Sequence, residues 1–306
     1  MPDSVNIKHT KALFITDLFE NFKTCSRYLF ALISLLSIFY GCTPQKKTFS
    51  KEQSAKINAF FLELLIDHQG AYTLLGSKPM TIESLFSSEE YEESLQYVES
   101  HPERLSFVID RRLEEGWKEW KKNSKYFPSS NYILAEIPFK DSRNLVFVNV
   151  QEVLTIFREN YEDFRQIAGM DFDPQQKICE LRDGKYEFWA LILNNYVSLG
   201  ILLGYGNKNS HFFENYMHTG GLDVFEASEK MDPRSFGGSP DLLSDPRFRA
   251  AECYLEGRPF YIPIFVAIDP VESEILVDRY KKEREQIRQH YQAKDFLDTT
   301  LSSYTR

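Results

Sequence analysis

Three residues with metal-binding side chains stand close together in the second half of the chain. His211, Glu214 and His218 are three and four residues apart, so a helix would place them on one face, where imidazole and carboxylate groups could share a metal ion. The spacing departs from the H-E-x-x-H motif, and the glycines around it argue against a long helix. We therefore expect polar surface or loop residues here and predict no metal site; these three residues come nearest to one.

Motifs for phosphate binding and nucleophilic catalysis are approached but not completed. The glycines of residues 200–210 (GILLGYGNKNS) would have to follow a strand to cradle a phosphate, whereas here they end an apolar helix. Ser198 and Ser239 lack the G-x-S-x-G elbow that exposes a nucleophile. Four aspartates are more typical of turns and helix caps than of an acid–base pair: Asp171, Asp173, Asp241 and Asp245. No cofactor is predicted.

A short apolar run near the N-terminus indicates membrane targeting. Residues 28–40 (YLFALISLLSIFY) carry no charge, and Lys23 and Arg27 precede them. A helix of this length spans about 20 Å, short of the roughly 30 Å hydrocarbon core of a bilayer, but it matches the apolar core of a signal peptide. We therefore predict a signal peptide or membrane anchor over residues 1–41.

The apolar run ends with a small residue directly before a cysteine. Gly41–Cys42 resembles the lipobox of bacterial lipoproteins, in which the thiol accepts a diacylglyceryl group and the leader is removed before the modified cysteine. Phe39 and Tyr40 depart from the leucine and the small residue that the lipobox prefers at these positions. We expect lipid on Cys42; a short uncleaved anchor and a chain that is not exported are the alternatives.

Two cysteines remain in the part that follows this leader, Cys179 and Cys253. In an oxidising compartment they could form a disulfide that stabilises the fold by about 4 kcal/mol. Two buried thiols that behave as small hydrophobic side chains are the favoured alternative. No C-x-x-C or Cys/His spacing indicates a zinc site.

Helix caps and hydrophobic periodicity predict helices on both sides of a β-hairpin. Ser50 is expected to cap a helix, whose apolar stripe is Ile57, Phe60, Phe61, Leu64 and Leu65. Two extended runs, residues 132–139 and 144–150, predict the two strands of the hairpin. Asn149 is expected to cap the helix that follows.

Further elements are predicted in the second half of the chain. Asp173–Pro174 indicates a helix start, and residues 185–203 are apolar around most of their circumference, which predicts a central buried helix. Residues 261–268 (YIPIFVAI) are expected to form a strand, and residues 273–291 a last amphipathic helix.

The composition is that of a folded protein. With 42% hydrophobic and 15% aromatic residues in 306, the chain can form a core rich in rings, and global disorder is excluded. The predicted fold class is α+β, predominantly helical: a single aromatic-rich domain with a small β-hairpin or sheet. Residues 42–52 would tether this domain, residues 53–306, and frequent Gly and Pro make residues 204–261 a loop-rich segment.

Two segments and the N-terminus resemble a set of uncharacterised bacterial lipoproteins of the chlamydial type. One segment is residues 71–80 (AYTLLGSKPM), with Tyr72, Gly76, Lys78 and Pro79, and the other is residues 200–210. The resemblance implies a location in the bacterial cell envelope with a lipid anchor in a membrane. Thr43, directly after the cysteine, is compatible with sorting to the outer membrane. No activity, cofactor or catalytic residue is implied.

The charge and the absence of a complete catalytic motif favour a binding role. The formal net charge of −9 disfavours nucleic acid as a partner, so we expect contact with a membrane, through the leader or a lipid, and a protein partner. The predicted function is that of an envelope lipoprotein acting as a binding or structural module. The alternatives are an envelope hydrolase with its site in the loops of residues 204–250 and an intracellular protein that is not exported.

Overall fold

The fold that positions every site described below begins at Phe49. The computed structural model describes residues 49–100, 112–140, 142–218, 253–263, 265 and 269–306, which belong to one unit, Phe49–Arg306, distinct from Met1–Thr48. The predicted leader, residues 1–41, and the predicted lipidation site, Cys42, lie outside the described residues. Among the helices in the described ranges, none is both long and apolar enough to cross a membrane.

The first helix starts at its predicted cap. Ser50 Oγ accepts a hydrogen bond from the Gln53 N–H, and the Gln53 side chain accepts one from the Ser50 N–H; this capping box fixes the start of α2 (Lys51–Leu62). The ring of Phe49 stacks on that of Phe127, with centroids 5.5 Å apart. Residues 49–52 are therefore part of the fold, which corrects the expectation that the tether runs to residue 52.

A π-helical turn continues α2 and leads into the next helix. In η1 (Glu63–Asp67) the chain makes a wider turn, closed by a hydrogen bond of 3.0 Å from the His68 N–H to the Glu63 carbonyl. Gln69 then adopts a positive φ of 61° before α3 (Ala71–Leu75) begins. Turns of this kind are concentrated at functional sites, and this one places polar side chains at the end of an apolar helix.

Three antiparallel strands form the sheet. The predicted hairpin is confirmed as β2 (Tyr132–Phe139) and β3 (Ser142–Asn149). A strand that the sequence did not predict, β1 (Met80–Leu85), pairs with the other edge of β3, so the order is β1-β3-β2. After β1 comes α4 (Ser88–Ser100). Among the described strands, one edge of β2 has no neighbour.

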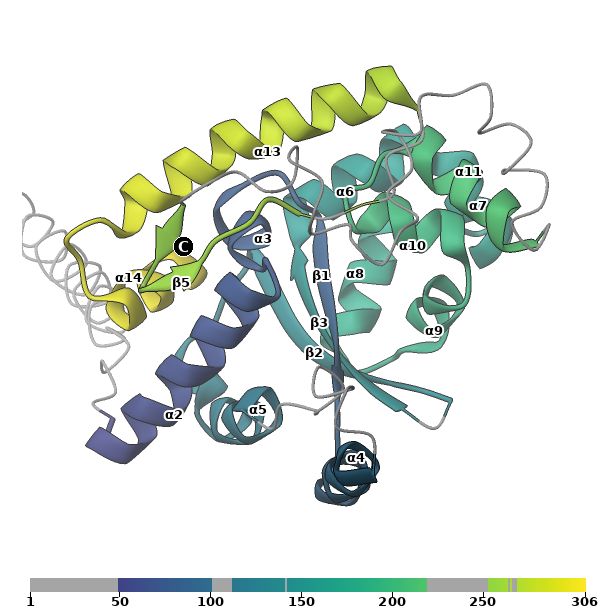
Figure 1. Cartoon of the computed structure of the whole chain (residues 1–306). Helices are drawn as coiled ribbons and strands as arrows, with labels where there is room; N and C mark the ends of the chain where they lie inside the picture. Colours follow the sequence, from purple (N-terminus) through teal and green to yellow (C-terminus); the bar gives the residue numbers. More distant parts are fainter. Residues whose placement is uncertain (1–48, 101–111, 141, 219–252, 264, 266–268) are drawn as a thin grey trace, which may run out of the picture. The chain divides into compact units, whose positions relative to one another are not determined.

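Helices cover both faces of the sheet, as Figure 1 shows. Successive β3 residues alternate between two cores, with Leu145 and Phe147 in the first and Val146 and Val148 in the second. The first core is completed by α2, α5 (Arg112–Asn123), α13 (Pro270–Tyr291) and α14 (Phe296–Tyr304). The second is completed by α6 (Val150–Glu159), α7 (Tyr161–Ala168), α8 (Pro174–Arg182), α9 (Glu187–Leu193) and α10 (Tyr196–Leu202). The α+β, predominantly helical class is thereby confirmed.

Two predicted caps are confirmed, and one predicted helix is wrong. The side chains of Asn149 and Asp173 accept hydrogen bonds from the first turns of α6 and α8. Residues 185–203, expected as one central helix, form α9 and α10 instead. The side chain of Asn195 accepts from the Ser198 N–H at 2.9 Å, so it caps a new helix rather than continuing the old one.

The segment expected to be loop-rich, residues 204–261, contains a regular helix, α11 (Asn207–His218), and a short hairpin of β4 (Tyr254–Leu255) and β5 (Arg258–Pro259). The strand expected at residues 261–268 is not seen at 261–263 or 265, the described part of that range. The helix predicted over residues 273–291 is confirmed as α13, but it is not the last one, because α14 follows it at residues 296–304.

Candidate functional site

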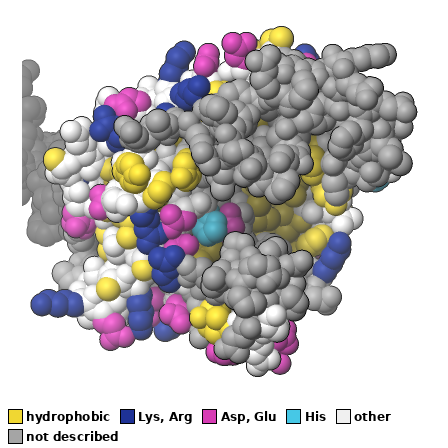
Figure 2. Space-filling view, in the orientation of Figure 1, with side chains coloured by type: hydrophobic (Ala, Val, Ile, Leu, Met, Phe, Trp, Pro, Cys, Tyr) yellow, Lys and Arg dark blue, Asp and Glu magenta, His cyan; other side chains and the backbone are white. Residues whose placement is uncertain are grey.

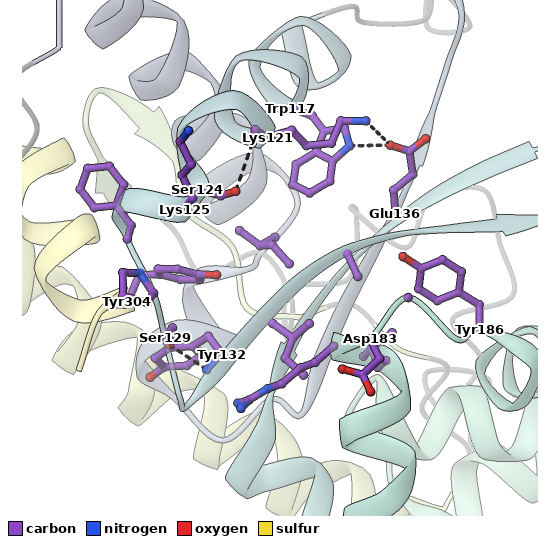
Figure 3. Close-up of a pocket in the computed structure, with 18 of the residues that line it drawn as sticks. Trp117, Lys121, Ser124, Lys125, Ser129, Tyr132, Glu136, Asp183, Tyr186 and Tyr304 are labelled. Atoms are coloured by element: carbon purple, nitrogen blue, oxygen red, sulfur yellow. Dashed lines mark hydrogen bonds and ion pairs between the residues drawn. The ribbon is translucent and has the colours of Figure 1, made fainter.

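A groove with a volume of about 830 Å³ runs along the unpaired edge of β2. In Figure 3, Trp117 and Lys121 of α5 lie on one side of the strand, and Asp183 and Tyr186 lie on the other. This β2 groove is lined by Trp117, Lys121, Ser124, Lys125, Phe127, Pro128, Ser129, Tyr132, Ile133, Leu134, Ala135, Glu136, Pro138, Arg143, Leu181, Arg182, Asp183, Gly184, Tyr186 and Tyr304. Its walls are α5, η3 (Ser124–Tyr126) and α14 on one face of the sheet, and the end of α8 on the other.

The backbone of β2 offers hydrogen-bonding groups to this groove. The Val150 N–H donates to the Asn131 carbonyl at 2.9 Å, and backbone bonds alternate along an antiparallel ladder. The peptide groups of Leu134 and Glu136 therefore point away from β3 and into the groove. The Tyr132 N–H also points outward, but it donates to Ser129 Oγ at 3.0 Å. Pro138, the next outward residue, has no N–H.

Glu136 is the polar centre of one groove wall. Its carboxylate accepts hydrogen bonds from Trp117 Nε1 at 2.8 Å, Lys121 Nζ at 2.6 Å and Arg143 at 3.2 Å. Burial alone would raise the pKa of Glu136, but hydrogen bonds from Lys121 and Trp117, the charge of Lys121 and the bond from Arg143 lower it to about 2. The carboxylate is thus anionic at neutral pH and ties α5 to the edge of the sheet.

Removal of this charge should destabilise the fold in a pH-dependent way. We expect Glu136→Gln to lower the free energy of unfolding by about 1 to 2 kcal/mol at pH 7. Because the pKa is depressed in the folded state, the stabilisation is full above the ordinary value of 4.5 and is lost as the pH falls toward 2. Urea titrations at several pH values measure this difference. Glu92→Gln, at an exposed position of α4, is the control. A difference in unfolding free energy between the wild type and Glu136→Gln that does not decrease in acid would contradict the stabilising role of the Glu136 charge.

Basic side chains outnumber acidic ones in the β2 groove. Its lining includes four basic residues, Lys121, Lys125, Arg143 and Arg182, and two acidic ones, Glu136 and Asp183. Lys121 and Arg143 are paired with Glu136. Lys125 lies over the ring of Tyr126, and the Arg182 guanidinium donates to the Ser130 carbonyl. Neither of these two has an acidic partner among the described residues, so the groove has a local surplus of positive charge on a chain that is acidic overall.

Packed aromatic rings make one wall rigid. Trp120 is fully buried and meets Tyr304 edge-on at 5.6 Å and Phe127 at 5.5 Å. Tyr304 in turn stacks on Tyr132 at 5.9 Å. Since Phe127, Tyr132 and Tyr304 all line the groove, its shape depends on the first core and not on loose surface side chains.

The residues that came nearest to a metal motif share one helix but do not converge on one point. His211, Glu214 and His218 all lie on α11, but His211 Nε2 faces Asp163 at 3.8 Å, while His218 Nε2 faces Glu214 at 3.9 Å. Within the described ranges, no three His, Cys, Asp or Glu side chains are arranged to hold a metal ion. Of the two alternatives expected here, polar surface or loop, the structure shows the first: the three residues belong to a helix of 12 residues, and both histidines are exposed.

The glycine-rich run 204–209 joins the starts of two helices, α11 and α13. Glu272 Oε2 accepts from the Asn209 N–H at 2.8 Å, and Asn209 Oδ1 accepts from the Asp269 N–H at 2.9 Å, which binds the start of α11 to that of α13. Gly206 has a φ of 89°, and a Cβ there would lie 2.4 Å from the Glu272 carboxylate. These glycines therefore allow a close backbone approach and do not cradle a phosphate.

The remaining sequence candidates do not form a site in the described structure. Ser198 is buried within α10, and Asp173 caps α8. Ser239, Asp241 and Asp245, with most of the loops proposed for a hydrolase, lie outside the described residues. Cys179 and Cys253 are both free thiols, the first exposed and the second half-buried, so the disulfide considered between them is not formed. Burial raises the pKa of the Cys253 thiol.

A polar cluster that the sequence did not reveal surrounds the π-helical turn. His68 Nδ1 lies 3.1 Å from Glu83 Oε2, and buried Glu63 faces both His68 at 3.9 Å and Arg258 at 3.4 Å. Burial opposes the charged form of His68, but the hydrogen bond and charge of Glu83, and the charge of Glu63, raise its pKa. Figure 2 shows acidic and basic side chains gathered near a histidine on the face in view.

The sequence holds no signal for this cluster, because Glu63 lies off the apolar stripe of the first helix, where an exposed carboxylate is expected. The ion pairs join η1 to β1 and to the β4–β5 hairpin, so the cluster stabilises the packing of these elements. None of the four residues of this cluster lines the β2 groove.

Comparison of the chain with protein-family models, with curated protein sequences and with solved structures finds no match. The geometry and charge of the β2 groove are therefore the features from which a function can be inferred.

Proposed function

We propose that this protein is a binding module that takes up an extended, acidic segment of a partner protein as an added strand along β2. Its N-terminal segment, through a lipid on Cys42, holds the module on a membrane of the bacterial cell envelope. The single observation that carries the binding role is the unpaired edge of β2 at the bottom of a groove whose walls come from both helical layers.

The geometry of the groove suits a strand better than a compact ligand. Tyr132, Leu134 and Glu136 share the first-core face with α5, whereas Ile133 and Ala135 share the second-core face with α8 and α9. Helices on both faces thus extend past the strand and leave a slot. Edge strands in such slots bind peptides through main-chain hydrogen bonds, and the walls select alternate side chains.

The length of the added strand is limited at both ends. The Tyr132 N–H already donates to Ser129 Oγ, and Pro138 has no N–H. The outward backbone donors that a partner strand can use are therefore those of Leu134 and Glu136. A partner segment would pair over about five residues, or roughly 17 Å. Each main-chain bond would add about 0.5 to 1.5 kcal/mol, so wall contacts must supply much of the affinity.

The charge of the groove favours an acidic segment. Lys125 of η3 and Arg182 at the end of α8 both line the groove, and neither has an acidic partner in the described structure. Partner carboxylates would reach one or the other, depending on whether their side chains point to the α5 wall or the α8 wall. Complementary charges of this kind mainly raise the association rate and decide between partners, so binding should weaken as salt increases.

A peptide pair tests the proposed function. In fluorescence anisotropy with full-length protein in detergent, we expect a capped peptide alternating glutamate with valine to bind about tenfold more tightly than one alternating lysine with valine. N-methylation of the acidic peptide at alternate residues removes its donors and should abolish binding. Lys125→Glu and Arg182→Glu should each weaken binding, whereas Lys282→Glu, on the exposed face of α13 away from the groove, should not.

Two outcomes would overturn the binding role. One is equal binding of the N-methylated and unmodified acidic peptides, because strand addition requires the main-chain bonds. The other is an equal effect of all three charge reversals, which would indicate a response to net charge alone. The proposed membrane location is tested separately by acyl labelling of the wild type and Cys42→Ala in a bacterial host. Label is expected on the wild type alone, and an unlabelled wild type with its leader still attached would refute the proposed lipid anchor.

A further inference from the structure

The two walls of the β2 groove differ in the size of the side chains that line them. The wall on the first-core face carries large rings, among them Trp117, Tyr132 and Tyr304. The wall on the second-core face includes Ala135 of β2 and Gly184, which follows the C-cap of α8. Because neither of these two residues has a side chain beyond Cβ, the second wall leaves room that rings fill on the first.

The end of α8 keeps this room open. Gly184 has a left-handed φ of 75°, its N–H donates to the Leu181 carbonyl at 3.3 Å, and the Lys185 N–H donates to the Glu180 carbonyl at 2.8 Å. This is the pattern of a glycine that ends a helix. A Cβ at Gly184 would meet, apart from its neighbours in the chain, only Tyr186, whose hydroxyl would be 3.6 Å away. The backbone of the helix end thus requires glycine, and the space beside it is free.

The second wall has an apolar floor and a charged rim. Three residues of the floor are almost fully buried and belong to the second core: Ile133, Ala135 and Leu181. The half-buried Tyr186 packs against the same core. Arg182 and Asp183 also line the groove, but both are exposed. A side chain that enters between the rim residues therefore meets carbon atoms.

The two main-chain donors of β2 decide which guest residue faces this floor. Residues directly opposite each other in neighbouring strands place their side chains on the same face of a sheet. When the guest pairs with Leu134 and Glu136, the guest residue opposite Ala135 lies between the two bonded positions and faces the second wall. Its two neighbours face the first wall, where Lys125 has no acidic partner in the described part of the chain.

From this arrangement we infer that the β2 groove selects guest strands in which one large apolar side chain, such as leucine, stands between two acidic residues. The apolar side chain lies over Ala135 and beside Gly184, and the flanking carboxylates face the wall of Lys125. The inference rests on the proposed strand addition and adds to it the residues that decide between guests. Ala135 and Gly184 determine specificity because they are small.

Two capped peptides of seven residues test this selection. Both have glutamate at alternate positions and serine at the second and sixth, and they differ only in the central residue, which is leucine or alanine. In fluorescence anisotropy with full-length protein in detergent, we expect the leucine peptide to bind about tenfold more tightly, because the larger side chain is partly buried on the floor.

A variant that fills the space should remove this preference. We expect Ala135→Leu to bind the leucine peptide no more tightly than the alanine peptide, while its affinity for the alanine peptide stays that of the wild type. Ala55→Leu is the matched control, because Ala55 is an exposed alanine of α2 that does not line the groove; it should keep the tenfold preference. Thermal unfolding shows whether each variant is folded, and Ala135→Val replaces Ala135→Leu if the latter is not.

The outcomes separate the selection from strand addition itself. Equal binding of the two peptides to the wild type would overturn the selection and leave strand addition standing. A preference that persists when position 135 is enlarged would overturn the selection as well, because the leucine would then lie elsewhere, and so would a preference lost in Ala55→Leu. If neither peptide binds, strand addition fails and the selection fails with it.

Discussion

Replacement of Lys78 by methionine is expected to raise the free energy of unfolding by about 3 kcal/mol at pH 7. Lys78 is only 4% exposed, and desolvation lowers its pKa from 10.5 to about 8, with a partly compensating attraction from Glu83. At pH 7 the folded protein must keep this ammonium charged in an apolar setting. Methionine has a similar length, fills the same volume and carries no charge.

The gain should disappear in alkali, and the sign of this change is fixed by the pKa shift. Between about 8 and 10.5 the unfolded chain keeps its proton on Lys78 while the folded chain has lost it, so wild-type stability rises with pH through that window. Urea titrations at pH 7 and pH 10 measure the convergence of the two proteins.

Lys282→Met provides the control, because Lys282 is exposed on α13 and a surface change of this kind alters stability by less than about 0.5 kcal/mol. A methionine variant less stable than the wild type would show that the Lys78 ammonium is well solvated or well paired in the fold.

Replacement of Trp120 by alanine is expected to cost about 4 kcal/mol of stability and to weaken acidic-peptide binding at the same time. Trp120 is fully buried and contacts Phe61 edge-on at 4.9 Å, as well as Tyr304 and Phe127. Loss of the indole leaves a cavity behind one wall of the β2 groove. Denaturant titration measures the first effect, and peptide titration of the folded protein measures the second.

Trp189→Ala separates the two effects. Trp189 is 1% exposed, lies in the second core and donates from Nε1 to the Lys177 carbonyl at 3.1 Å, so its loss should destabilise the fold by a similar amount. Peptide affinity should survive it, because Trp189 does not line the groove. Equal loss of binding in both variants would mean that general destabilisation, and not the wall behind Trp120, controls binding. If the Trp120→Ala variant does not fold, the same two measurements are made on Trp120→Phe.

Local signals in the sequence were sufficient for several helix starts and for the hairpin. Ser50, Asn149 and Asp173 cap helices because short polar side chains bond to backbone groups within three residues. The hairpin of residues 132–150 is also local, since its strands are joined by a short turn. The prediction of one helix over residues 185–203 was wrong. It relied on apolar side chains around the whole circumference and did not recognise Asn195 as the cap of a second helix.

Long-range features could not be predicted in the same way. Strand β1 pairs with β3 across about 60 residues of sequence, and its pattern of two buried residues, two half-buried, one exposed and one buried gives no clear alternation. The β2 groove depends on walls from α5, α8 and α14, which only the tertiary packing brings together. The burial of Lys78 likewise depends on the distant Gly204, which approaches its side chain.

The position of Pro138 has a consequence for self-association. Two copies that aligned their β2 edges would build a continuous intermolecular sheet only if outward donors extended along the whole strand. Pro138 removes the donor at one end, and Ser129 consumes the donor at Tyr132 at the other. Polymerisation through β2 is therefore interrupted at both ends, and this edge can stay open for a short guest strand without seeding fibrils.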